Sequence, residues 1–116
     1  MSLKEKILIA DDSEMNQMLL EEILSDKYEY VMAKDGTEAV DILEKNEDID
    51  LVMLDINMPK IDGFGVLEIM NLRHWISEVP VIIISSESDV DFIRRGYDLG
   101  ASDYISRPFD LTVVRR

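Results

Sequence analysis

The sequence predicts an α/β fold in which a parallel sheet of five strands carries helices on both faces. Three observations predict it. Short aliphatic runs without polar alternation recur along the chain, as is typical of strands that are buried on both faces. Segments whose apolar residues recur at helical spacing lie between these runs. The two patterns alternate through the whole chain, which indicates parallel strands joined by right-handed crossovers.

The strands are predicted, in chain order, at residues 6–10, 28–32, 51–54, 80–84 and 103–106. The first, third and fourth are the aliphatic runs, and the fourth is the strongest. The last is short and mixed in composition, as an edge strand is. A doubly wound sheet with the flavodoxin-like strand order 2-1-3-4-5 is the common solution for this pattern.

Four helices are predicted between the strands. The first has a stripe that we expect to pack as core, with the methionines as its filler, made of Met15, Met18, Leu19, Glu22 and Ile23. Apolar spacing predicts the others around residues 39–43, 64–72 and 92–99, and Gly100 ends the last of them as a C-terminal glycine.

Length and composition bound the possibilities. The 116 residues fit one domain, 1–116, and 47% hydrophobic with 32% charged residues is the balance of a globular chain. No apolar run approaches the roughly 20 residues of a membrane helix. The net charge of −13 argues against direct nucleic-acid binding by this domain. The absence of cysteine excludes disulfides and thiolate metal sites. Together these points favour the cytoplasm as the location. The single histidine, His74, is interpreted as a surface or packing residue.

Acidic residues stand at the predicted carboxyl ends of two neighbouring strands. Asp11 and Asp12 follow the first strand and Asp55 follows the third, at the edge where such sheets bind ligands. Helix capping by Asp12 or Ser13 would explain one position only. Converging carboxylates repel one another unless a cation is present, and oxygen ligands without histidine or cysteine suit Mg²⁺, with Mn²⁺ as the alternative.

Two further groups extend this candidate site. Ser85 at the end of the fourth strand supplies a hydroxyl, and Arg107 after the fifth supplies a positive charge. Acids, a divalent cation, a hydroxyl and a fixed base together suit a phosphoryl group, with one aspartate as the nucleophile.

These residues resemble the receiver domain of bacterial two-component response regulators. The resemblance runs from Lys6 to about Arg116, and it rests on the order and spacing of the acidic pair 11–12, LDINMP at 54–59, Asp-Gly at 62–63, PVIIIS at 80–85, GASDYI at 100–105 and RPF at 107–109.

The resemblance implies a role for each matching position. Asp55 would accept a phosphoryl group from a phosphohistidine on a sensor histidine kinase or a phosphotransfer protein. Asp12 and Asp55 would ligate Mg²⁺ with the Asn57 backbone carbonyl, and Asp11 would act largely through water. The domain would then be a phosphoacceptor with only slow self-dephosphorylation, and not an enzyme with an outside substrate.

The same resemblance implies a switch. Ser85 would turn toward the acyl phosphate and Tyr104 would follow it, while the side chains at Asn57 and Glu87 would set the lifetime of the phosphoryl group. Arg107 departs from the family, which almost always has lysine there. Because arginine is longer, planar and forked, we hypothesise that phosphorylation survives but that its rate or its coupling to Tyr104 is altered.

The carboxyl-terminal segment predicts a truncated final helix. Asp110 has the character of an N-cap, and only residues 111–116 follow it. We expect the chain to be the N-terminal fragment of a longer regulator with an output domain beyond Arg116. Cover of the exposed sheet by a partner or a second copy in a homodimer is the alternative.

Competing functions use parts of the same pattern. A haloacid-dehalogenase-type phosphatase would need a second acid where Asn57 stands, and a flavin module would not place acids in its first loop. A degenerate receiver, acting as a phosphorylation-independent interaction module, is kept open by Arg107.

Overall fold

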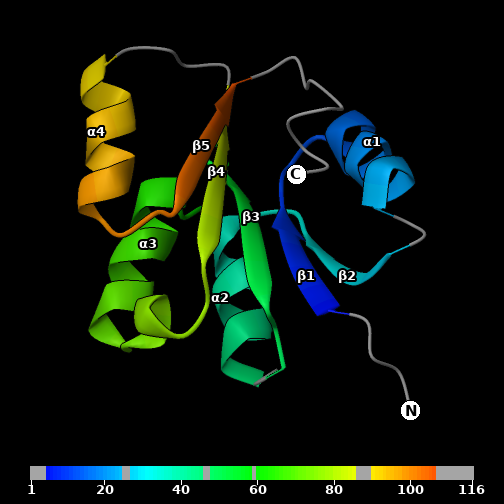
Figure 1. The fold of residues 1–116 in the computed structure, drawn as a ribbon, viewed down its shortest axis with the longest axis horizontal. Coiled ribbons are helices and arrows are strands. Elements are labelled where there is room, and N and C mark those ends of the chain that lie inside the picture. Colours follow the sequence, from blue (N-terminus) through cyan, green and yellow to red (C-terminus); the bar gives the residue numbers. More distant parts are fainter. Residues whose placement is uncertain (1–4, 25–26, 46–47, 59, 86–89, 107–116) are drawn as a thin grey trace.

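The computed structural model describes residues 5–24, 27–45, 48–58, 60–85 and 90–106. Its centre is a five-stranded sheet in the order β2-β1-β3-β4-β5, and every neighbouring pair is parallel (Figure 1). The predicted flavodoxin-like topology is therefore confirmed. The strands are β1 (Glu5–Ala10), β2 (Tyr28–Ala33), β3 (Leu51–Asp55), β4 (Val81–Ser85) and β5 (Asp103–Ser106).

Helices follow the first four strands, as the alternating pattern predicts. They are α1 (Glu14–Leu24), α2 (Gly36–Lys45), α3 (Gly63–Leu72) and α4 (Val90–Asp98), and a short 3-10 turn, Trp75–Ser77, precedes β4. Gly100 adopts a φ of 105° after α4, a conformation that glycine reaches without steric cost. The predicted final helix after Asp110 lies outside the described residues.

The sheet has a core on each face because successive strand residues point to opposite sides. On one face, Leu8, Leu54 and Ile83 pack with residues of α2 and α3. On the other, Ile7, Ile9 and Met53 pack with Leu20 of α1. The central strands are thus buried on both faces, which explains why their sequences lack polar alternation.

The predicted core stripe of α1 is wrong for the residues that the structure describes. Met15 and Met18 are 78% and 68% exposed, and Leu19 and Glu22 are also exposed. Among the side chains of this helix that the structure describes, Leu20 is the buried one, and Ile23 lies outside the described side chains. Leu20 stands five positions after Met15, about 140° away around a helix of 3.6 residues per turn. Apolar residues on several sides of α1 make its periodicity ambiguous, and only the sheet decides which side is covered.

No helix in the described ranges is long and apolar enough to cross a bilayer.

Candidate functional site

The register of the sheet brings the predicted acids together. Ala10 of β1 pairs with Leu54 of β3, so the residues that follow them, Asp11 and Asp55, emerge side by side at the carboxyl edge. One carboxylate oxygen from each of Asp11, Asp12 and Asp55 lies within 4.8 Å of the others. Asp11 and Asp55 are only 1% and 2% exposed, whereas Asp12 is open to solvent. The cluster therefore has a buried base and one accessible side.

The turn after β1 shows which residue caps α1. The Ser13 hydroxyl accepts a hydrogen bond from the Asn16 N–H at 3.3 Å, and the Ser13 carbonyl accepts one from the Gln17 N–H at 3.0 Å. Ser13 is thus the N-cap, as one of the two capping interpretations predicted. Capping does not account for Asp12.

The loop after β3 holds Asp55 against the start of α3. The Asp55 carboxylate accepts a hydrogen bond from the Asn57 N–H at 3.3 Å, and the Gly63 N–H donates to the Ile56 carbonyl at 2.8 Å. A Cβ at Gly63 would stand 2.5 Å from the Asp55 carbonyl oxygen. Only glycine lets the helix begin this close to the acid.

The donor set fits a hard divalent cation. Three carboxylates converge within one ion's reach, and two of them are almost fully buried. Such clustered negative charges repel one another and are compensated most directly by a cation. The chain has no cysteine, and its single histidine lies elsewhere. Oxygen-only ligation of this kind suits Mg²⁺ or Mn²⁺.

Ser85 and Tyr104 lie on the same side of the sheet. Asp55 pairs with Ile84, so the fully buried Ser85 is the next residue along β4. Tyr104 pairs with Ile83, which shares its face with Ser85 because they are two residues apart on one strand. Tyr104 is half-buried and packs against the core that contains α3. The geometry thus puts both predicted switch residues on one face.

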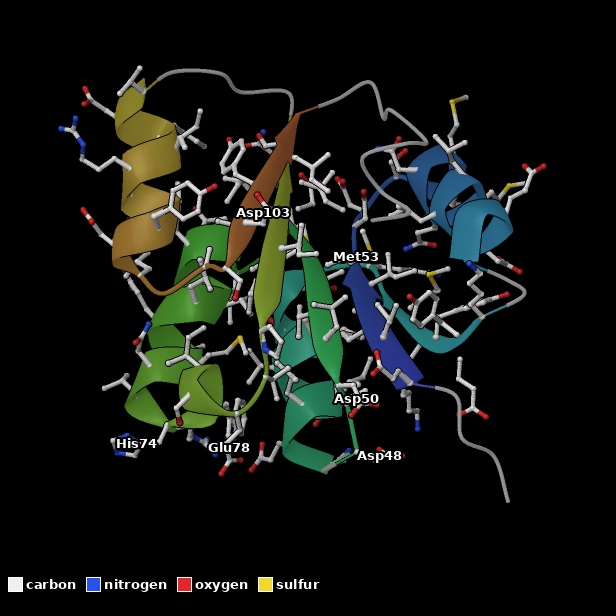
Figure 2. All side chains as sticks on the ribbon, viewed as in Figure 1. Asp48, Asp50, Met53, His74, Glu78 and Asp103 are labelled. Atoms are coloured by element: carbon white, nitrogen blue, oxygen red, sulfur yellow. The ribbon has the colours of Figure 1, made fainter. Side chains whose placement is uncertain are left out.

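Three other predicted site residues have different outcomes. Asn57 lies two positions after Asp55 with its side chain exposed. Glu87 and Arg107 lie outside the described residues, so their predicted roles stay predictions. His74 is exposed just after α3, whose other end lies against Asp55, in agreement with its interpretation as a surface residue (Figure 2).

The structure adds an ion pair that the sequence analysis missed. Asp35 caps α2 by accepting the Glu38 N–H at 2.8 Å, and its other oxygen lies 3.5 Å from the Lys60 ammonium. The Glu38 N–H lowers the pKa of Asp35 most, and Lys60 lowers this pKa further against the opposing effect of burial. Lys60 belongs to the loop after Asp55, and its φ of 68° is unusual for a residue with a side chain. The sequence signal that could have indicated a role for Asp35 is its position just after a predicted strand.

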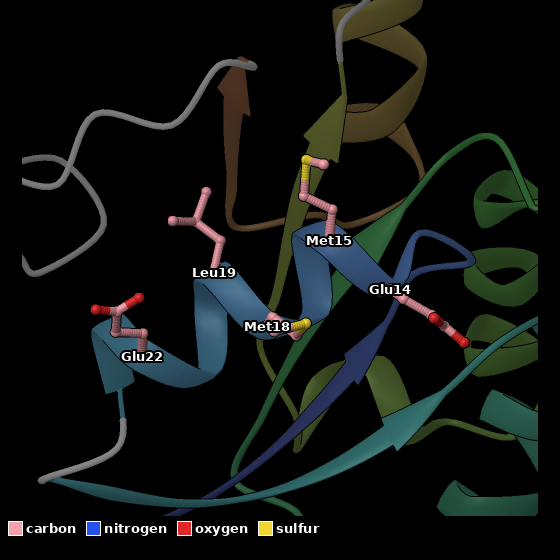
Figure 3. A pocket seen from close by; sticks show the side chains of 5 residues that line it. All are labelled: Glu14, Met15, Met18, Leu19 and Glu22. Carbon is pink, nitrogen blue, oxygen red and sulfur yellow. The ribbon is translucent and has the colours of Figure 1, made fainter.

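An open apolar hollow lies along α1, beside the acidic cluster. Met15, Met18 and Leu19 line it, with Glu14 and Glu22 at its two ends (Figure 3). These are the residues whose exposure contradicts the predicted core stripe. The hollow begins at Glu14, two residues after Asp12 in the sequence.

Comparisons with known proteins agree with this geometry. The response regulator receiver domain family matches residues 7–116. The chain is 44% identical over 107 residues to the "Probable transcriptional regulator ycf27" of Porphyridium aerugineum, covering 91% of this chain and 43% of that protein. It is 36% identical to "Sporulation initiation phosphotransferase F" of Bacillus subtilis, covering 97% and 90%. The crystallised chemotaxis protein CheY4 of Vibrio cholerae superposes with a TM-score of 0.88 at 26% identity, covering 97% and 93%. The chain thus spans less than half of the first relative and most of the other two.

Proposed function

The chain belongs to the response regulator receiver domain family, and we propose that it accepts a phosphoryl group on Asp55 with the help of Mg²⁺. The observation that carries this proposal is the convergence of three carboxylates at the ends of β1 and β3. In this role the domain is a signalling module in a phosphorelay and does not turn over an outside substrate.

The chemistry requires little more than positioning. An Asp55 carboxylate oxygen attacks the phosphorus of a phosphohistidine, the P–O bond forms as the P–N bond breaks, and the imidazole nitrogen takes up a proton. Asp11, Asp12 and Asp55, with the Asn57 carbonyl, would hold the cation. When bound, Mg²⁺ supplies charge neutralisation for the phosphoryl oxygens. The buried Ser85 hydroxyl would donate a hydrogen bond to one of them.

Labelling with a small phosphodonor tests the proposal. The parent chain is incubated with acetyl phosphate in Mg²⁺ or in EDTA, and its intact mass is measured before and after hydroxylamine, which cleaves acyl phosphates. We expect a hydroxylamine-sensitive adduct of one phosphoryl group in Mg²⁺ only. An absent adduct in both buffers would favour the degenerate receiver, and an adduct that persists in EDTA would refute the role of the cation.

Arg107 provides a prediction about the rate of this reaction. Its positive charge would bind phosphoryl oxygens. Its planar guanidinium differs in shape from the ammonium of the lysine that the family has there. Arg107→Lys is expected to change the labelling rate or the adduct lifetime while labelling itself persists. Time courses of acetyl phosphate labelling and of decay after removal of the donor measure both. Equal values for parent and variant would refute the hypothesis.

The hollow on α1 provides a prediction about the donor protein. A phosphohistidine that reaches Asp55 must approach the carboxyl edge, where α1 begins, and Met18 is exposed about one turn into that helix. Met18→Asp is expected to slow transfer from a histidine kinase that labels the parent by about tenfold, as loss of a central apolar contact does, while acetyl phosphate labelling keeps its rate. Leu72→Asp is the matched control, since Leu72 is 79% exposed at the far end of α3. Equal slowing of the two variants would exclude a contact at α1.

Signal output is proposed to pass through Ser85 and Tyr104 to the face that carries α4. The relative from Porphyridium aerugineum is named a probable transcriptional regulator, and this supports a proposal that the receiver controls an output domain in a longer protein. Tyr104 is half-buried in contact with the core on that face, where a shift would alter the surface of β5.

A further inference from the structure

Three contacts among the described residues hold the turn that carries two of the acids. The Asp11 N–H donates to the Ala33 carbonyl at 3.0 Å, and the Asp11 carboxylate accepts the Ser13 N–H at 2.9 Å. These contacts fix Asp11 itself. The third contact comes from α1, where the Gln17 side-chain amide donates to the Asp11 carbonyl at 2.5 Å.

That carbonyl belongs to the peptide group that joins Asp11 to Asp12. Because a peptide group is planar, fixing its oxygen also fixes the direction of its N–H and the position of the next Cα, which is that of Asp12. The Asp12 carboxylate is exposed, unlike those of Asp11 and Asp55, so packing does not determine its direction. The position of the backbone at Asp12 must therefore determine the direction of this carboxylate.

The chemistry of Gln17 matches this task. A primary amide has two N–H donors, and a second carbonyl, that of Ala33, lies 3.4 Å from the same nitrogen. The amide thus joins the end of β2 to the turn after β1. A glutamate there would present only acceptors to these two carbonyls, and an apolar side chain would present nothing.

We propose that Gln17 is a positioning residue for cation binding, which holds the Asp11–Asp12 peptide so that the Asp12 carboxylate faces Asp55. This role rests on the proposed function, because it needs the carboxylate cluster to bind a divalent cation. Gln17 does not itself contact the cation. It opposes the tendency of three like charges to move apart when the site is empty.

Direct titration of the chain with Mn²⁺, followed by water proton relaxation, measures the effect without phosphorylation. Gln17→Met keeps the length of the side chain and removes its donors, and it is expected to weaken Mn²⁺ binding about tenfold, as loss of a group that orients a metal ligand does. Gln17→Glu is expected to weaken it further. Asn16→Leu, a similar change of an amide at the neighbouring position, is expected to leave the affinity unchanged.

A second comparison shows whether the effect passes through Asp12. In an Asp12→Asn background, Gln17→Met is expected to cause no further loss of Mn²⁺ affinity. In the cation-free chain, the amide chemical shift changes that Gln17→Met causes are expected to centre on residues 11–13. Urea unfolding of this variant is expected to remain cooperative. Parent-like affinity of Gln17→Met, or an additive loss in the Asp12→Asn background, would overturn the positioning role alone. A parent that binds no Mn²⁺ would overturn the proposed function, and the positioning role with it.

Discussion

Replacing Asp55 with asparagine is expected to abolish the phosphoryl adduct entirely and to make the metal-free chain more stable. The amide is not a nucleophile, yet its oxygen can still accept the Asn57 N–H. One of three negative charges within 4.8 Å disappears, and the relief of repulsion is expected to raise the free energy of unfolding by about 1–2 kcal/mol. Urea denaturation in EDTA and intact mass after acetyl phosphate treatment measure the two effects.

The cation is expected to reduce this difference in stability. Under the proposed function, Mg²⁺ would bind the folded parent and stabilise it by mass action, so the advantage of Asp55→Asn is expected to shrink as Mg²⁺ is added. Asp50→Asn is the matched control, because Asp50 is an exposed acid at the amino end of β3. It should label like the parent and show no Mg²⁺-dependent change in relative stability. Labelling of Asp55→Asn at the parent's rate would show that another residue is the acceptor.

The fold was predictable because its strongest signals are local. Runs such as 80–84 have no polar residue to place on a solvent face, so they had to be buried strands, and the order of elements then left one common topology. The structure begins β4 at Val81, not at Pro80, because proline lacks the N–H that a ladder needs and contributes only its carbonyl, to the Val52 N–H at 3.0 Å.

The orientation of α1 was not predictable in the same way. Apolar residues occupy more than one side of this helix, and which side is buried depends on the tilt of the helix against the sheet. The side that was predicted to be core is the exposed hollow. Periodicity reports that a helix has an apolar face, but only packing identifies the covered one.

The acids of the candidate site were predictable because they stand at strand ends. The residues that contact the loops around these acids were not predictable. Asp11 and Asp12 follow β1 and Asp55 ends β3, so the register of these two strands brings the acids together. Gln17 acts through a side-chain contact to a backbone carbonyl, and nothing in its sequence neighbourhood separates it from an ordinary polar helix residue. The same holds for Lys60, whose partner Asp35 is 25 positions away.

Gly63→Ala is expected to lower the free energy of unfolding by about 2 kcal/mol and to slow acetyl phosphate labelling. The new Cβ would stand 2.5 Å from the Asp55 carbonyl oxygen and 2.7 Å from the Ile56 Cα, which are both backbone atoms of the strand end. Neither can rotate away, so α3 must shift from the acid, and forced overpacking costs about 1–3 kcal/mol. The shift also moves the loop that holds the Asp55 carboxylate.

Gly65→Ala separates this clash from the general effect of alanine in a helix. Its Cβ would also come close to a neighbour, at 2.6 Å, but that neighbour is the Cγ2 atom of Ile61, the end of a partly exposed side chain. The side chain can rotate, and alanine favours the helix by up to about 1 kcal/mol over glycine. We therefore expect Gly65→Ala to remain within about 1 kcal/mol of the parent and to label normally. If both variants lost stability equally, tight packing against Asp55 would not be the reason that α3 begins with glycine.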